Sequence, residues 1–269
     1  MDGRTKFAFT NQAGRTRLDD LYQQGALRVM FPRVTAYDMI EAVIATISGG
    51  LVGGDQLEVD VSVRRRAQAM VTTQAAEKVY RSVGPDTCVA VNLQLERGGW
   101  LEWMPQETII FDGARLRRRI TLNVENGARA LAGEIVAFGR SGRGERLTNG
   151  LLHDEWRVMT DGRLVWADNL HLDGDIASKM NASAGFQGCN GMATFVYAAS
   201  DAPRWLECSR QMIHDGAMFA GVTCIDDVLV ARWLGNDVAV VRSEYKKFRE
   251  GFRTMVGRFP ATSPRIWNS

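Results

Sequence analysis

Apolar and polar residues alternate with a period of two along most of the first two thirds of the chain. Apolar side chains occupy every second position in residues 57–63, 89–95 and 116–124, with Arg118 as the exception in the third stretch. Alternation of this kind predicts strands that bury one face and expose the other.

Turn signals separate these stretches at short intervals. The dipeptides Asn126-Gly127, Asn149-Gly150 and Asp161-Gly162 each predict a tight hairpin, because their residues tolerate positive φ. Residues 151–172 accordingly predict two antiparallel strands around the last dipeptide. Many short strands with frequent turns favour a sandwich, barrel or β-helix over alternating βαβ units.

The period lengthens after about residue 200, where apolar residues recur every three to four positions. Asp201 predicts the start of a first helix that Gly216 ends, and residues 228–234 predict a strand. A longer helix is predicted from an Asn236 cap to Gly257, with a continuous apolar stripe along it.

These patterns predict an all-β-dominated fold. We expect many short strands in a layered, β-helix-like or sandwich-like body, with two α-helices near the C-terminus. The chain contains no linker, low-complexity tract or internal repeat, so residues 1–269 are predicted to form a single domain.

Composition narrows the class of protein. Hydrophobic residues make up 45% and charged residues 24% of the 269 positions, which are ordinary values for a globular protein. The formal net charge is only +2, and the basic triplets at 64–66 and 117–119 lie in strand-like sequence, where outward-facing charges are expected. Nucleic-acid binding is therefore not predicted.

The absence of a visible signal peptide and the spacing of the cysteines indicate a cytoplasmic protein. The four cysteines form no C-x-x-C pair, no signal peptide is visible, and no apolar run approaches the length of a bilayer span. We expect a cytoplasmic protein with reduced thiols and no membrane association.

Metal-binding residues are scarce, whereas carboxylates occur in unexpected places. The chain has three histidines and neither an H-x-H nor an H-x-x-x-H motif, so a firm nickel, zinc or copper site is not predicted. Glu134 and Asp168 both lie in apolar sequence. Acids on the inner faces of strands could line a wet channel, where water and cations satisfy them.

Residues 103–114 form the most informative segment. They hold Glu107 and Asp112 inside an otherwise apolar run, and burial of either carboxylate without a partner would be costly. Such residues beside a strand either stabilise a local turn or line a polar interior. Both interpretations stay open from the sequence.

Several separated blocks of sequence resemble a known family, the urease accessory proteins called UreD, or UreH in some organisms. The segments containing Leu-Glu-Trp-Met-Pro-Gln-Glu and Phe-Asp-Gly-Ala are the most specific of these blocks. The likeness extends from about residue 45 to the C-terminus. The blocks are residues 49–55, 72–82, 101–107, 111–114, 138–140, 144–146, 172–174 and 264–267.

The resemblance implies a scaffold and not an enzyme. Members of the family bind apo-urease with UreF and UreG and help to insert Ni²⁺, while GTP hydrolysis belongs to UreG. The resemblance also implies an internal water-filled passage, which Asp55, Ser82, Glu134 and Asp168 would contact in this sequence. No cofactor would be held stably, since the nickel ion would only be in transit.

Weak oxygen ligands suit such a passage, because conduction requires sites that also release the ion. Two alternatives remain. A carboxylate hydrolase would need two of four acids within about 5–10 Å of each other at an open cleft. A plain β interaction module would need none of them. The four acids are Glu102, Glu107, Glu134 and Asp168.

Partner binding is predicted on the C-terminal helix, residues 236–256, and the adjoining strand edges. Trp233 and Trp267 are expected to be exposed there, and aromatic residues commonly anchor interfaces. The alternative is that these aromatic residues simply cover the core.

Overall fold

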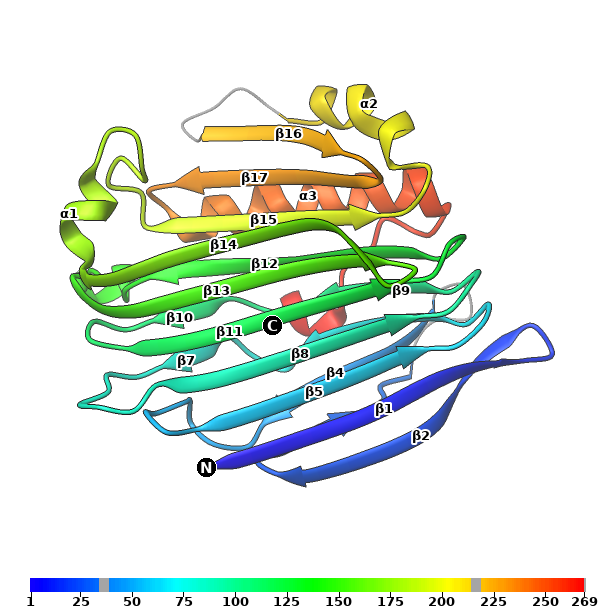
Figure 1. Ribbon diagram of the computed structural model, residues 1–269, viewed down its shortest axis with the longest axis horizontal. Helices are drawn as coiled ribbons and strands as arrows, with labels where there is room; N and C mark the ends of the chain where they lie inside the picture. Colours follow the sequence, from blue (N-terminus) through cyan, green and yellow to red (C-terminus); the bar gives the residue numbers. More distant parts are fainter. Residues whose placement is uncertain (34–38, 214–218, 269) are drawn as a thin grey trace.

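Two stacked β-sheets with one long helix on the outside form the body of the protein (Figure 1). A computed structural model describes residues 1–33, 39–213 and 219–268. Strands and helices account for most of these residues. The all-β-dominated prediction is therefore confirmed.

The first sheet has seven strands, in the order β14-β13-β11-β8-β5-β1-β2. Its strands are long and alternate between buried and exposed residues, as the period of two predicts. They are β1 (Asp2–Gln12), β2 (Arg15–Gly25), β5 (Gln56–Val63), β8 (Thr87–Leu95), β11 (Arg115–Val124), β13 (Asn149–Thr160) and β14 (Arg163–Asp175).

The second sheet has ten strands, eight of them in the order β16-β17-β15-β12-β9-β6-β4-β3. The short β10 pairs with β12, and the short β7 pairs with β10. The strands are β3 (Leu27–Met30), β4 (Ile40–Thr46), β6 (Gln68–Thr73), β7 (Glu77–Val79), β9 (Trp100–Met104), β10 (Thr108–Ile110), β12 (Arg129–Phe138), β15 (Gly191–Ala198), β16 (Phe219–Ile225) and β17 (Val228–Gly235).

From β4 to β13 the chain passes repeatedly from one sheet to the other and winds as a solenoid of parallel ladders, with the short β7 and β10 as additional strands of the ten-stranded sheet. Gln56 pairs with Cys88 in one sheet, and Gln68 pairs with Trp100 in the other. The offset is the same for these two pairs, so each turn of the chain places one strand in the seven-stranded sheet and at least one in the ten-stranded sheet. The layered, β-helix-like prediction describes this arrangement.

The winding explains why two predicted hairpins are wrong. Asn126-Gly127 leads from β11 into β12, which lies in the other sheet, and Asn149-Gly150 begins β13. Only Asp161-Gly162 joins antiparallel neighbours, β13 and β14, with φ of 48° and 79°. In a solenoid the other turns make corners between the layers.

Two apolar cores lie on either side of the ten-stranded sheet. One fills the space between the sheets, and the other lies between the ten-stranded sheet and α3 (Val238–Gly257). Strands β12 and β15 are buried along almost their whole length because both of their faces are covered.

The long C-terminal helix was predicted almost to its ends. Asp237, one residue after the predicted cap, accepts a hydrogen bond of 2.8 Å from the backbone N–H of Ala239. The helix ends at Gly257, and the following C-cap residue, Arg258, has φ of 57°. The other helical segments are α1 (Ile176–Asn181), α2 (Leu206–Gln211), η1 (Ser141–Arg143), η2 (Ala202–Trp205) and η3 (Arg265–Asn268).

The first predicted helix is observed as the short η2 and α2, and its expected end at Gly216 lies outside the described residues. The sequence did not predict α1. Asp175 caps this helix by accepting a hydrogen bond of 3.1 Å from the N–H of Ser178. No helix in the described parts of the chain is long and apolar enough to cross a membrane.

The expectation of exposed tryptophans beside α3 is wrong. Trp233 is 2% exposed and Trp267 is 5% exposed, and both belong to the core under α3. Trp267 stacks on Tyr245 and donates a 2.9 Å hydrogen bond to the hydroxyl of Thr72. Large apolar side chains are exposed instead on β16, at Phe219 and Ile225.

Candidate functional site

A cluster of charged residues bridges the two sheets inside the apolar core. Arg118 on β11 is ion-paired with Asp154 on β13 and with Glu134, which projects from β12 in the opposite sheet. The Arg118 guanidinium also donates to the Thr108 hydroxyl at 2.9 Å, and the Trp156 indole donates to Glu134 at 2.8 Å. Every charged group in this cluster therefore has a partner, as burial requires.

Burial and charge set the protonation of the cluster. Burial, together with the nearby Asp154 carboxylate, raises the pKa of Glu134 to about 8. Burial alone would lower the pKa of Arg118, but Asp154 and Glu134 more than reverse this and raise it. At neutral pH Arg118 thus stays a cation, and Glu134 is mostly protonated.

The free energy of unfolding should fall as the pH rises from about 5 to about 8, and Glu134→Gln should remove roughly 1–3 kcal/mol of that fall. The carboxyl of Glu134 loses its proton near pH 4.5 when unfolded but near pH 8 when folded. Between these values the folded chain binds more protons, so rising pH favours unfolding. Urea titrations at several pH values measure the slope.

Glu77 adds a slope of the same sign, because burial raises its pKa too. The test is therefore the difference between the wild type and Glu134→Gln. An identical slope in Glu134→Gln and the wild type would contradict the assignment.

A cavity of about 400 Å³ opens beside the charged cluster. Glu134, Asp154 and Asp168 all line it, together with Arg232 of β17. Asp168 on β14 is ion-paired with Arg232, so this pair links the two sheets near the mouth of the cavity. The structure thus brings two of the predicted residues, Glu134 and Asp168, to one cavity.

A smaller cavity of about 80 Å³ lies between the sheets, and Arg118 and Thr108 line it. It also contains Glu77, whose carboxylate accepts a 2.6 Å hydrogen bond from the Thr46 hydroxyl. Since Glu134 and Asp154 line the larger cavity and Arg118 lines the smaller one, the charged cluster lies between the two.

The other two predicted residues, Asp55 and Ser82, lie at or beside the glycine-rich residues 49–55. Asp55 is 2% exposed, and its carboxylate pairs with the N-terminal amine at 2.7 Å and accepts from the N–H of Val52 at 2.9 Å. The Ser82 hydroxyl donates to the carbonyl of Pro85 at 2.6 Å. A Cβ at Gly53 would lie 2.1 Å from the Ser82 oxygen, so this close approach requires glycine.

The carboxylates of Glu102, Glu107 and Asp112 all have partners in the structure. Glu102 is fully buried under α3 between Arg249 and Arg253, and Glu107 pairs with Arg242 at 3.0 Å. The carboxylate of Asp112 accepts from the N–H and hydroxyl of Thr148, both at 2.7 Å. Asp112 therefore links its own turn to residues 148–149, whereas Glu107 ties its strand end to α3.

Of the acids required for hydrolysis, Glu134 and Asp168 share an open cavity, but each is paired with an arginine. A hydrolase would need one carboxylate free to act as a base or nucleophile. The pairing of both acids therefore does not favour that chemistry.

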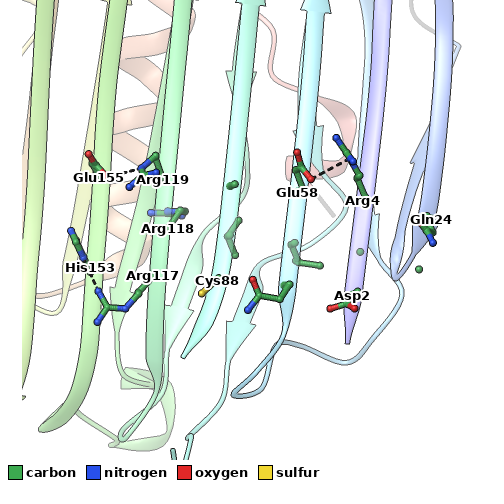
Figure 2. Close-up of a pocket in the computed structure, with 16 residues that line it drawn as sticks. Asp2, Arg4, Gln24, Glu58, Cys88, Arg117, Arg118, Arg119, His153 and Glu155 are labelled. Carbon is green, nitrogen blue, oxygen red and sulfur yellow. Dashed lines mark hydrogen bonds and ion pairs between the residues drawn. The ribbon is translucent and has the colours of Figure 1, made fainter. Parts of the chain in front are cut away.

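A further depression, of about 640 Å³, lies elsewhere, on the outer face of the seven-stranded sheet (Figure 2). Its arginines and carboxylates form ladders of ion pairs across neighbouring strands, such as Arg4 with Glu58 at 3.1 Å and Arg119 with Glu155 at 2.7 Å. It contains none of the four predicted passage residues.

Sequence reasoning missed Arg118 and Asp154. The triplet at 117–119 was expected to face outward, but Arg118 is 9% exposed and points between the sheets, while Arg117 and Arg119 face solvent. The interruption of the apolar alternation at Arg118 was the available signal. Asp154 occupies the same inward phase as Leu152 and Trp156.

Among the described residues, no group of three or more histidine, cysteine, aspartate or glutamate side chains is arranged to hold a metal ion. The stacked sheets, the covering helix and the paired charges between the layers define a solenoid-like β protein with a charged cluster inside its apolar core.

Comparison with known proteins places this protein in a family. Residues 1–268 match the family model described as UreD urease accessory protein. The chain is 42% identical to a urease accessory protein UreD of Magnetococcus marinus, over 100% of this chain and 94% of the relative. It is 35% identical to the one of Azorhizobium caulinodans, over 98% and 95%. The chain belongs to the UreD family of urease accessory proteins, as the resemblance indicated.

Proposed function

We propose that this chain is a non-catalytic scaffold that binds apo-urease together with UreF and UreG and guides Ni²⁺ towards the urease active site. Family membership supports the accessory role. In this proposal GTP hydrolysis belongs to UreG, and the nickel ion is cargo and not a resident cofactor.

The observation that carries the proposal is the row of polar residues across the inter-sheet core. It begins with Asp168 at the open cavity, continues through the Glu134–Asp154–Arg118 cluster, and reaches Glu77 in the inner cavity. Carboxylates and hydroxyls bind divalent ions less tightly than imidazole or thiolate would, so an ion could enter and leave.

The Arg118 guanidinium occupies the place that a cation would take between Glu134 and Asp154. A nickel ion that follows this row must therefore displace Arg118 from at least one carboxylate. Because Glu134 is mostly protonated at neutral pH, entry of the ion must also release its proton. We propose that Arg118 keeps the row closed in the isolated chain.

The first test of the proposal is assembly with the other accessory proteins. Co-expressed with UreF, UreG and apo-urease, the chain should co-purify with them, and the urease should gain nickel as measured by elemental analysis. A folded chain that never associates with these proteins would overturn the proposal.

The second test changes Asp168, the first residue of this polar row, without disturbing the core. Asp168 is 32% exposed. Asp168→Lys would place a second cation beside Arg232 at the mouth of the larger cavity. We expect the nickel content of co-expressed urease to fall roughly tenfold, because like charge repels the divalent ion, while complex formation is retained.

Asp173→Lys is the matched control, because it makes the same charge change on the same strand at an exposed residue that does not line the cavity. It should leave the nickel content unchanged. Equal nickel content in both variants and the wild type would reject the inter-sheet route, while assembly would still test the accessory role separately.

A further inference from the structure

Two of the three histidines of the chain face each other on the outside of the protein. His153 on β13 and His171 on β14 are directly opposite in the antiparallel register. Their ring centroids are 5.2 Å apart, and the ring planes are nearly perpendicular, at 87°. Both side chains lie on the outer face of the seven-stranded sheet, opposite to the face on which Asp154 is buried.

This spacing suits coordination of a single metal ion. Two imidazoles bound at adjacent positions, with metal–nitrogen bonds of about 2.1 Å, place their ring centres roughly 4.5–5 Å apart. A small rotation of the side chains is therefore enough to direct one nitrogen of each ring at a common point. Strand pairing holds the two Cα atoms in place, so little conformational freedom is lost on binding.

Arg117 is a charged neighbour of this histidine pair and contacts His153 directly. Its guanidinium lies 3.0 Å from Nδ1 of His153 and pairs with Asp86 at 2.5 Å, as Figure 2 shows for the His153 contact. Since a guanidinium only donates, Nδ1 of His153 accepts this bond. A metal ion bound to the His153 ring would have to compete with this contact and lie near a positive charge.

We infer that His153 and His171 form a surface site for a late first-row divalent ion such as Ni²⁺, Cu²⁺ or Zn²⁺. Imidazole favours these ions over Mg²⁺, and affinity should rise from Ni²⁺ to Cu²⁺. Water completes the coordination, because both side chains are partly or fully exposed. A site with two protein ligands exchanges its ion readily. This inference is independent of the inter-sheet route.

The test uses the full chain without a polyhistidine tag, titrated with NiCl₂, CuCl₂ and MgCl₂. Isothermal titration calorimetry should show Ni²⁺ binding that weakens roughly tenfold or more in both His153→Gln and His171→Gln, because each variant loses one arm of the chelate. In nuclear magnetic resonance spectra, paramagnetic Ni²⁺ should broaden the ring signals of His153 and His171 together. Mg²⁺ should leave these signals unchanged.

Two controls locate the site. His214→Gln removes the third histidine, which lies outside the described residues, and should leave the affinity unchanged. Cys88→Ser should also leave it unchanged, because β11 separates Cys88 on β8 from the histidine pair. Unchanged nickel binding in His153→Gln and His171→Gln, or its loss in His214→Gln, would overturn the inference.

Arg117→Gln distinguishes a metal-binding histidine pair from a pair with only a structural role. Removing the guanidinium frees Nδ1 and removes a positive charge next to the site, so Ni²⁺ should bind severalfold more tightly. The same tightening should be absent from the double variant Arg117→Gln/His171→Gln. An affinity that Arg117→Gln does not change would place the ion elsewhere and overturn the inference.

Discussion

Arg118→Met should lower the free energy of unfolding by about 3–5 kcal/mol, the cost typical of removing one partner from a buried ion pair. The substitution leaves the Asp154 carboxylate 2% exposed and without its cation, and it leaves the Thr108 hydroxyl without its donor. Methionine fills much of the same volume, so loss of packing contributes little. Denaturant titration followed by far-ultraviolet circular dichroism measures the loss.

Arg117→Met is the matched control on the same strand. Arg117 faces solvent and pairs with Asp86 at the surface, so the control should cost less than about 1 kcal/mol. A second variant separates charge from shape. Combining Arg118→Met with Asp154→Leu and Glu134→Gln removes both acids, and stability should largely return because apolar replacement of a buried ion cluster is often neutral. Equal losses in Arg117→Met and Arg118→Met would contradict the buried cluster.

Period-two alternation made the strands predictable, because a half-buried strand leaves a clear mark in the sequence. It could not reveal which strands pair. Parallel neighbours such as β5 and β8 are far apart along the chain, and their pairing depends on contacts that no local pattern records. The same gap explains why Asn126-Gly127 was taken for a hairpin. The turn chemistry is right, but the two strands that it joins enter different sheets.

Glu134 was predictable as a candidate because its strand is otherwise apolar on both faces. Asp154 was not predictable as a candidate. Polar and apolar residues alternate in its strand, so the sequence does not distinguish one inward-facing acid from the outward-facing polar residues on either side. Arg118 has the same ambiguity within its triplet. Burial of a charge depends on partners from β12 and β13, so only the assembled layers distinguish these residues from their exposed neighbours.

Burial alone does not make an acid part of the row of polar residues between the sheets. Glu102 is as buried as Glu134, but it lies on the opposite face of the ten-stranded sheet, where Arg249 and Arg253 of α3 contact it. The two clusters therefore act on different interfaces. One holds the sheets together and borders the two cavities, and the other attaches the helix.

Glu102→Gln should destabilise the protein by about 3–5 kcal/mol and should loosen α3 first. The carboxylate of Glu102 lies between Arg249 at 2.8 Å and Arg253 at 2.9 Å, and both arginines are buried. The same arginines donate to the backbone carbonyls of Thr262 and Pro260, so the C-terminal segment depends on the cluster too. Hydrogen exchange should accelerate in α3 and residues 258–268 more than in the parallel strands.

Glu244→Gln provides the control on the same helix. Glu244 pairs with Lys247 at 2.7 Å at the helix surface, and this pair contributes less than about 1 kcal/mol if it resembles other exposed pairs. Hydrogen exchange in α3 should then match the wild type. Uniform acceleration across both sheets in Glu102→Gln would show instead that the helix and the sheets unfold as one unit. Neutralising both Arg249 and Arg253 as methionine in the Glu102→Gln background should recover part of the loss, because the uncompensated charge, and not the missing volume, causes it.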